Sequence, residues 1–233
     1  MSFFSTNYAK PGPGIDKDAP PKKGLALFFD VYIRAFWELI KLNLLFLLFC
    51  VPVITIGPAC AGMSRVTMLM MRERPFFVWG DFWKGFKQEF KQSFITGLLL
   101  AVVTTGLVFG IRFYFAAAAQ NNIFYAAWFM LLVAGFMLSL SCIYLYPLIV
   151  TVKLPLFTLY KNAMLLGIVC LKQSLPALII IFVLVLAMLL LLPFTVPVLF
   201  LMFFSLVGFI CSFSAWPGIK THVVSKAQKE QEA

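Results

Sequence analysis

The feature that most constrains this chain is a pair of long stretches without any charged residue, residues 113 to 152 and residues 173 to 219. A helix that crosses a bilayer needs about 20 apolar residues, and each stretch is about twice that long. Residues 116–122 (AAAAQNN) interrupt the first stretch, and Pro193 and Pro197 interrupt the second. Each stretch is therefore predicted to form a hairpin of two membrane-spanning helices.

The composition supports an integral membrane protein. Hydrophobic residues make up 62% of the chain and charged residues 12%, whereas soluble domains average about 25% charged residues. The formal net charge of +10 comes from Lys and Arg that flank the hairpins. By the positive-inside rule these flanks are expected to face the cytoplasm, which predicts a multi-pass protein of the cytoplasmic membrane with both termini inside. Outside the apolar segments there is no basic and aromatic platform, so the partner of these charges is expected to be the lipid bilayer and not nucleic acid.

The first third of the chain leaves the number of spans open. Residues 42 to 64 and 92 to 111 are two further uncharged runs, and six spans result if residues 58 to 74 cross back. Arg65 lies near the centre of that segment, and a charge at mid-membrane costs about 2.5 to 3.5 kcal/mol. The favoured prediction is nevertheless six spans, because the alternative of five spans and an outside N-terminus leaves the basic N-terminal region on the far side. Another alternative is an amphipathic helix along the membrane interface.

The predicted return segment carries small residues that suit close helix contact, namely Ala59, Ala61, Gly62 and Ser64. An all-α polytopic helical bundle is thus expected, with a short tail at each end. Residues 1–24 are rich in Pro and Lys and are predicted to be a disordered cytoplasmic tail, residues 25–220 a single transmembrane domain, and residues 221–233 a second cytoplasmic tail.

A short internal echo predicts three similar units. Lys91-Gln92-Ser93-Phe94 and Lys172-Gln173-Ser174-Leu175 begin two of the outward helices, and Lys41-Leu42-Asn43-Leu44 occupies the corresponding place in the first. An amphipathic segment precedes each of them, at residues 28–37, 81–90 and 157–171. Each unit is expected to contain an interfacial helix, an outward helix and a return helix.

One of these interfacial helices has an aromatic face. Phe82, Trp83, Phe86 and Phe90 recur at spacings of three and four residues, which places them on one side of a helix. Beside the lysines of that segment, they predict a surface that packs against acyl chains or against a partner.

The sequence offers little that could perform catalysis. The only histidine is His222 in the C-terminal tail, no GxxxxGK[ST] motif is present, and the carboxylates lie in tails, loops or helix ends. No catalytic residue, metal site or cofactor is therefore expected, and the five cysteines, which occur singly, are expected to be small core residues. Arg65 and Arg112 are the candidates for a polar site within the membrane, although Arg112 near a helix end is also suited to reach the interface.

Several segments resemble the YesL family of bacterial multi-span membrane proteins. They are Thr55-Ile56-Gly57-Pro58-Ala59 with the return segment after it, the Asp81-Phe82-Trp83-Lys84-Gly85-Phe86-Lys87 stretch and the Tyr146-Pro147 pair. The resemblance covers roughly residues 25 to 220. Members of that family have no established biochemical role, and they are often encoded beside sugar-import ABC transporters.

The resemblance implies a noncatalytic accessory subunit of a carbohydrate ABC importer, in contact with its permease subunits. Two alternatives stay open, a freestanding carrier of small solutes with a cavity near Arg65 and a membrane signalling scaffold. The sequence leaves the oligomeric state undetermined.

Overall fold

The computed structural model describes residues 24–119, 121–192 and 194–224, and in this part of the chain all regular structure is helical. Most of the two predicted tails lies outside the described residues. The elements are α1 (Leu25–Arg34), α2 (Phe36–Cys50), the 3-10 turn η1 (Val53–Thr55), α3 (Ile56–Met71), α4 (Val78–Gln88), α5 (Phe90–Ala118), α6 (Phe124–Thr151), α7 (Leu156–Val169), α8 (Leu171–Leu190), α9 (Val196–Val198), the π-helical turn η2 (Leu199–Phe203), α10 (Phe204–Ile219) and a second π-helical turn η3 (Lys220–Val224). The prediction of an all-helical polytopic bundle is confirmed.

Five helical segments of the described chain are long and apolar enough to cross a membrane. They are Val53–Met71, Phe90–Ala118, Phe124–Thr151, Leu171–Leu190 and Val196–Val223. The segment around Arg65, which was the doubtful one, is among the five. The expected span before it is not, because α2 has 15 residues and is about 22 Å long, whereas the hydrocarbon core is about 30 Å thick. The described residues therefore contain five long apolar helices, where six spans were favoured. The segment that falls short is α2, and not residues 58 to 74.

The threefold repeat predicted from the sequence is present in the order of the helices. Each unit has a short helix, an outward helix and a return helix, which are α1, α2 and α3, then α4, α5 and α6, then α7, α8 and α10. In every unit a single residue separates the short helix from the outward helix, and we call this residue the elbow. The three elbows are Ala35, Glu89 and Cys170.

The three elbows share one backbone conformation. Their φ and ψ angles are −96° and 9° at Ala35, −103° and 17° at Glu89, and −98° and 32° at Cys170. These values lie in or near the sparsely populated bridge region, where one residue suffices to change the direction of a helix. The serines of the two Lys-Gln-Ser echoes stabilise the bend, because the Ser93 and Ser174 hydroxyls donate to the carbonyls of Glu89 and Cys170 at 2.5 and 2.9 Å. In the first unit Leu39 stands four residues after the elbow, where the other units have serine. The predicted match of Lys41 with Lys91 and Lys172 is therefore wrong.

The three units close into a ring. The return helices α3, α6 and α10 all contact one another at the centre, and each outward helix lies between two of them, α2 between α10 and α3, α5 between α3 and α6, and α8 between α6 and α10. The short helices follow the same rule, since α4 packs on α3 and α7 packs on α6. In the first unit the Phe28 ring of α1 lies 5.1 Å from the Phe209 ring of α10. The core is therefore a pseudo-threefold arrangement of helices with α3, α6 and α10 innermost.

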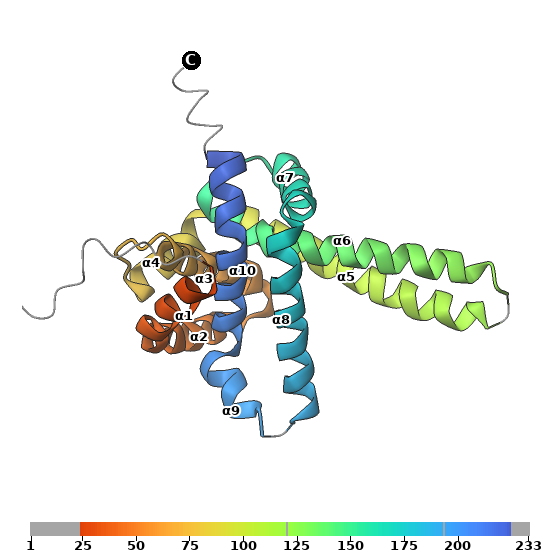
Figure 1. Ribbon diagram of the computed structural model, residues 1–233, viewed down its shortest axis with the longest axis horizontal. Helices are drawn as coiled ribbons and strands as arrows, with labels where there is room; N and C mark the ends of the chain where they lie inside the picture. Colours follow the sequence, from red (N-terminus) through yellow and green to blue (C-terminus); the bar gives the residue numbers. More distant parts are fainter. Residues whose placement is uncertain (1–23, 120, 193, 225–233) are drawn as a thin grey trace, which may run out of the picture.

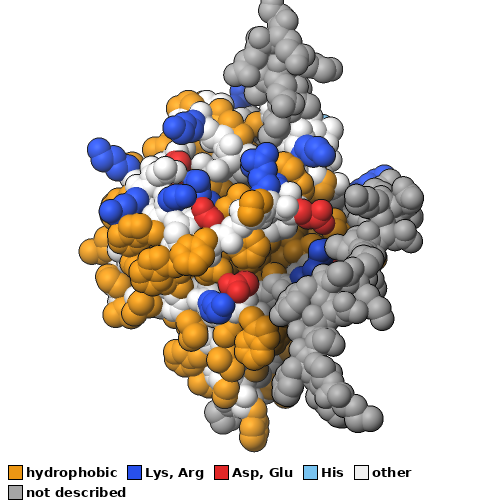
Figure 2. Space-filling view, turned by 90° about the vertical axis from the view of Figure 1, so that its left-hand side faces the viewer, with side chains coloured by type: hydrophobic (Ala, Val, Ile, Leu, Met, Phe, Trp, Pro, Cys, Tyr) orange, Lys and Arg blue, Asp and Glu red, His pale blue; other side chains and the backbone are white. Residues whose placement is uncertain are grey.

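The units differ in how far they extend from this core. Figure 1 shows the α5–α6 hairpin projecting sideways, while α8 and the chain from α9 to α10 form a second hairpin in a different direction. Only 6% of the most apolar 18-residue window of α5 is buried, against 61% for the segment that contains α3. On the face turned toward the reader in Figure 2, most Lys and Arg side chains gather in the upper half, and hydrophobic side chains dominate the lower half.

Candidate functional site

The centre of the ring is built where α3 and α10 run side by side in the same direction. Met63 covers Gly208, where an added Cβ would come within 2.9 Å of the methionine methyl carbon. One turn further on, the Thr67 and Ser212 hydroxyls lie 2.7 Å apart. Both hydroxyls are fully buried, and they satisfy each other, as polar groups inside a membrane protein require. The predicted small-residue face of α3 is confirmed, because Ala59, Ala61, Gly62 and Ser64 are all buried.

Arg72 joins the three return helices at their common end. It follows the last residue of α3, and its guanidinium lies over the Trp216 ring of α10 with 4.4 Å between the carbon Cζ and the ring centroid. Its Nη2 donates to the Thr151 hydroxyl of α6 at 3.1 Å. One side chain therefore contacts both other members of the central triplet, and we call Arg72, Thr151 and Trp216 the arginine clasp.

The charge of Arg72 is stabilised without a carboxylate partner in the described part of the chain. Helices α3 and α6 both end at this point, at Met71 and Thr151, and the negative ends of their dipoles favour a cation. Burial, and next the charge of Arg74, lower the pKa of the Arg72 guanidinium from its usual value. The Nε of Arg72 is buried and has no hydrogen-bond partner among the described residues. Aromatic and dipole interactions thus hold a partly buried cation at the basic end of the core.

Arg65, the stronger of the two predicted polar residues, lies elsewhere. Its Nη1 donates to Gln88 Oε1 at 3.1 Å, and its stem packs against Gly85 of α4. The contact is close because Gly85 approaches Gly62, so that a Cβ on Gly85 would come within 3.0 Å of the Gly62 Cα. Arg65 therefore faces the α3–α4 contact and not the centre of the ring.

Arg112 lies on the exposed surface of the projecting hairpin. The first part of α5 contacts α3 where Gly97 meets Gly57, and Arg112 lies about 22 Å further along α5. The structure therefore does not bring Arg65 and Arg112 together into one site.

The predicted aromatic face of residues 82–90 is turned mainly inward. Phe82 is fully buried and Phe86 is nearly so, and both rings contact Phe49 of α2, at centroid distances of 5.4 and 5.1 Å. Only Trp83 and Phe90 keep a substantial exposed fraction, 37% each. As a free surface for a partner this face was predicted wrongly for Phe82 and Phe86, because α4 packs its aromatic stripe on α2 and α3 instead of on lipid.

Two residues that the sequence reasoning missed hold the core together. Arg72 stands in a run of loop-like charges (MMRER), and only its place at the end of a return helix distinguishes it. Asn43 is fully buried in α2 and bonds to η2, donating to the carbonyls of Leu199 and Phe200 at 3.2 and 2.6 Å and accepting from the Ser205 amide at 3.0 Å. An Asn inside an otherwise apolar run was the signal that could have indicated this role.

The described residues contain no group of three or more side chains that could hold a metal ion. The five cysteines are free and partly buried. The arginine clasp fixes the relative positions of three helices, because Arg72 at the end of α3 contacts both Thr151 of α6 and Trp216 of α10.

The comparisons with known proteins found a family match for part of the chain. No curated protein and no solved structure matches the chain. Residues 39–111, about a third of the chain, match a family model. They include all of α3 and α4 and most of α2 and α5, and hence both glycine contacts of α3. The family whose model they match is described as a protein of unknown function, DUF624.

Proposed function

We propose that the protein is a noncatalytic subunit of the cytoplasmic membrane that attaches to a carbohydrate ABC importer, with the arginine clasp and both termini on the cytoplasmic side. The observation that carries the proposal is the contrast between the packed ring centre and the uncovered α5–α6 hairpin. Met63, Thr67, Gly208 and Ser212 fill the space between α3 and α10, and this packing does not favour a solute path through the centre of the ring.

The α5–α6 hairpin supplies surface for a neighbour in the membrane. Phe109 and Phe113 lie one turn apart on α5 and are 71% and 67% exposed. Helix association within a bilayer is driven in part by van der Waals packing, and exposed side chains of α5 can supply it to another helix. We therefore assign the contact with the permease subunits to this hairpin, in place of the buried Phe82 and Phe86.

The importer as partner follows from the resemblance to YesL-like proteins. The DUF624 match supports that resemblance, because YesL-like proteins belong to this family. The freestanding carrier, for which a cavity near Arg65 is expected, receives less support, because Arg65 packs against Gly85 of α4 and donates to Gln88.

The test is affinity purification of the tagged protein from its native membrane in a mild detergent, followed by mass spectrometry of stoichiometric partners. We expect the two permease subunits and their ATPase with the unmodified protein, and their loss with the double substitution Phe109→Ala and Phe113→Ala. The matched control is Phe182→Ala with Leu189→Ala on α8, which are 66% and 62% exposed. Recovery of the protein without permease subunits, or equal loss in the control, would contradict the proposal.

A further inference from the structure

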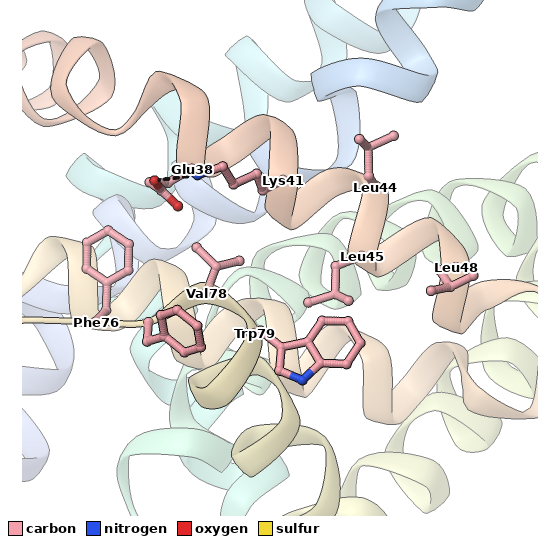
Figure 3. A pocket seen from close by; sticks show the side chains of 9 residues that line it. Glu38, Lys41, Leu44, Leu45, Leu48, Phe76, Val78 and Trp79 are labelled. Atoms are coloured by element: carbon pink, nitrogen blue, oxygen red, sulfur yellow. Dashed lines mark hydrogen bonds and ion pairs between the residues drawn. The ribbon is translucent and has the colours of Figure 1, made fainter.

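A groove with one charged end runs along the outer face of the first unit. It lies between α2 and the segment that leads into α4, and its volume is about 650 Å³. Figure 3 shows Glu38 and Lys41 at one end of the groove, Leu44, Leu45 and Leu48 following along α2, and Phe76, Val78 and Trp79 on the opposite side. The volume falls within the range of about 300 to 1,000 Å³ that is typical of sites for small ligands.

The polarity of the groove changes in one direction. Lys41 Nζ lies 2.9 Å from Glu38 Oε1, and both belong to the part of α2 nearest its elbow. Beyond them the lining is aliphatic and aromatic, and Leu44, Leu48 and Trp79 remain 50%, 61% and 56% exposed. A lining of this kind fits a ligand with a polar end and a long apolar part.

The second unit has a related pocket of about 560 Å³ at its elbow, lined by Gln88, Glu89, Gln92, Lys153 and Leu154. There Gln92, three residues after the elbow, donates to the Leu154 carbonyl at 2.8 Å and ties the next linker to α5. The corresponding residue of the first unit is Glu38, whose side chain pairs with Lys41 instead. Glu38 therefore stays beside Lys41 at the charged end of the groove.

We propose that this groove binds one phospholipid of the bilayer, with an acyl chain along Leu44, Leu48 and Trp79 and a zwitterionic headgroup at Lys41 and Glu38. The bilayer supplies this ligand directly, because the apolar part of the groove lies beside helices that have an exposed hydrophobic surface. Lys41 complements the phosphate, and Glu38 complements the ammonium of a phosphatidylethanolamine headgroup.

Two sets of variants separate the apolar part from the charged end. Leu44→Trp with Leu48→Trp fills the groove without altering the core, and Leu98→Trp with Val102→Trp on α5 is the matched control, since those residues are 57% and 65% exposed. Lys41→Gln removes the cation of the charged end. Its control is Lys84→Gln, because Lys84 is 63% exposed and pairs with Asp81 three residues away, as Lys41 is 64% exposed and pairs with Glu38.

The measurement is native mass spectrometry of the full-length protein, delipidated in detergent and then titrated with phosphatidylethanolamine or phosphatidylglycerol. We expect one saturable phosphatidylethanolamine per chain, lost with the double Trp variant and weakened about tenfold by Lys41→Gln, as for loss of a hydrogen bond to a charged group. Both controls should bind as the unmodified protein does. If the double Trp variant fails to fold, Lys41→Gln against Lys84→Gln decides alone.

Other outcomes would overturn the proposal. Lipid adducts that do not saturate at one, or that persist in the groove variants, indicate annular lipid only. Equal binding of phosphatidylglycerol contradicts the zwitterionic headgroup, and a protein partner that crosslinks to position 44 or 48 in native membranes replaces the lipid as the occupant.

Discussion

At the scale of single residues, Arg72 connects the three return helices, although no sequence pattern indicated this role. Its guanidinium reaches α6 and α10 from the end of α3, through the Thr151 hydroxyl and the Trp216 ring. Arg72→Ala removes a cation–π contact and a charge-assisted hydrogen bond, and we expect a loss of about 2 to 4 kcal/mol in the free energy of unfolding. Chemical unfolding in detergent, followed by circular dichroism, measures this loss.

Arg72→Lys separates charge from geometry at the same site. A lysine keeps the cation near the ends of α3 and α6 but lacks the planar fork that stacks on Trp216, so we expect an intermediate stability. Arg74→Ala is the control, because Arg74 is exposed. If the Arg72→Ala variant unfolds with the same midpoint as the unmodified protein, the arginine clasp contributes nothing to the free energy of unfolding.

The aromatic residues of α4 provide a second prediction at this scale. Phe82 is fully buried against Gly62 and Phe49, so Phe82→Ala should lower the free energy of unfolding by about 3 to 5 kcal/mol. Trp83→Ala, one residue further on and 37% exposed, should cost clearly less. Thermal unfolding of both variants side by side checks the order, and a larger effect at Trp83 would mean that α4 presents its other face to the core.

At the scale of elements, the join between η2 and α10 depends on a residue from another unit. The wide π-helical turn at Leu199–Phe203 leaves backbone groups for Asn43 to bond. Asn43→Leu leaves them without this partner in an apolar setting, at about 1 to 3 kcal/mol for each unsatisfied group. We expect faster amide hydrogen exchange at residues 199–205. Asn122→Leu, in the exposed turn before α6, is the control and should leave that exchange unchanged.

Also at the element scale, the elbows show how much the sequence could predict. Lys-Gln-Ser at residues 91–93 and 172–174 indicated related helix starts, and the structure gives the reason, since each serine bonds to the carbonyl of an elbow. The first elbow could not be found in this way, because Leu39 stands where the serine would be. Hydropathy also indicated the two long hairpins, while the length of α2 depends on where the helix ends at Cys50, before Pro52.

At the scale of the whole molecule, the contacts between units were beyond the reach of sequence patterns. Amphipathic spacing correctly placed Phe82 and Phe86 on one face, but it could not tell whether lipid or the protein covers that face. Likewise the charge of Arg72 was visible, whereas its neighbours Thr151 and Trp216 come from distant parts of the chain. The contact between the last unit and the first, with Phe28 against Phe209, exists only when the three units of the chain have closed into a ring.

The diverging hairpins give the molecule an uneven outline in a bilayer. Both originate near the elbows and move apart toward their tips (Figure 1), and an apolar cleft of about 710 Å³ lies in the angle between α5, α6, α8 and α10. One chain thus forms both walls of an apolar recess, whose lining comes from residues far apart in the sequence.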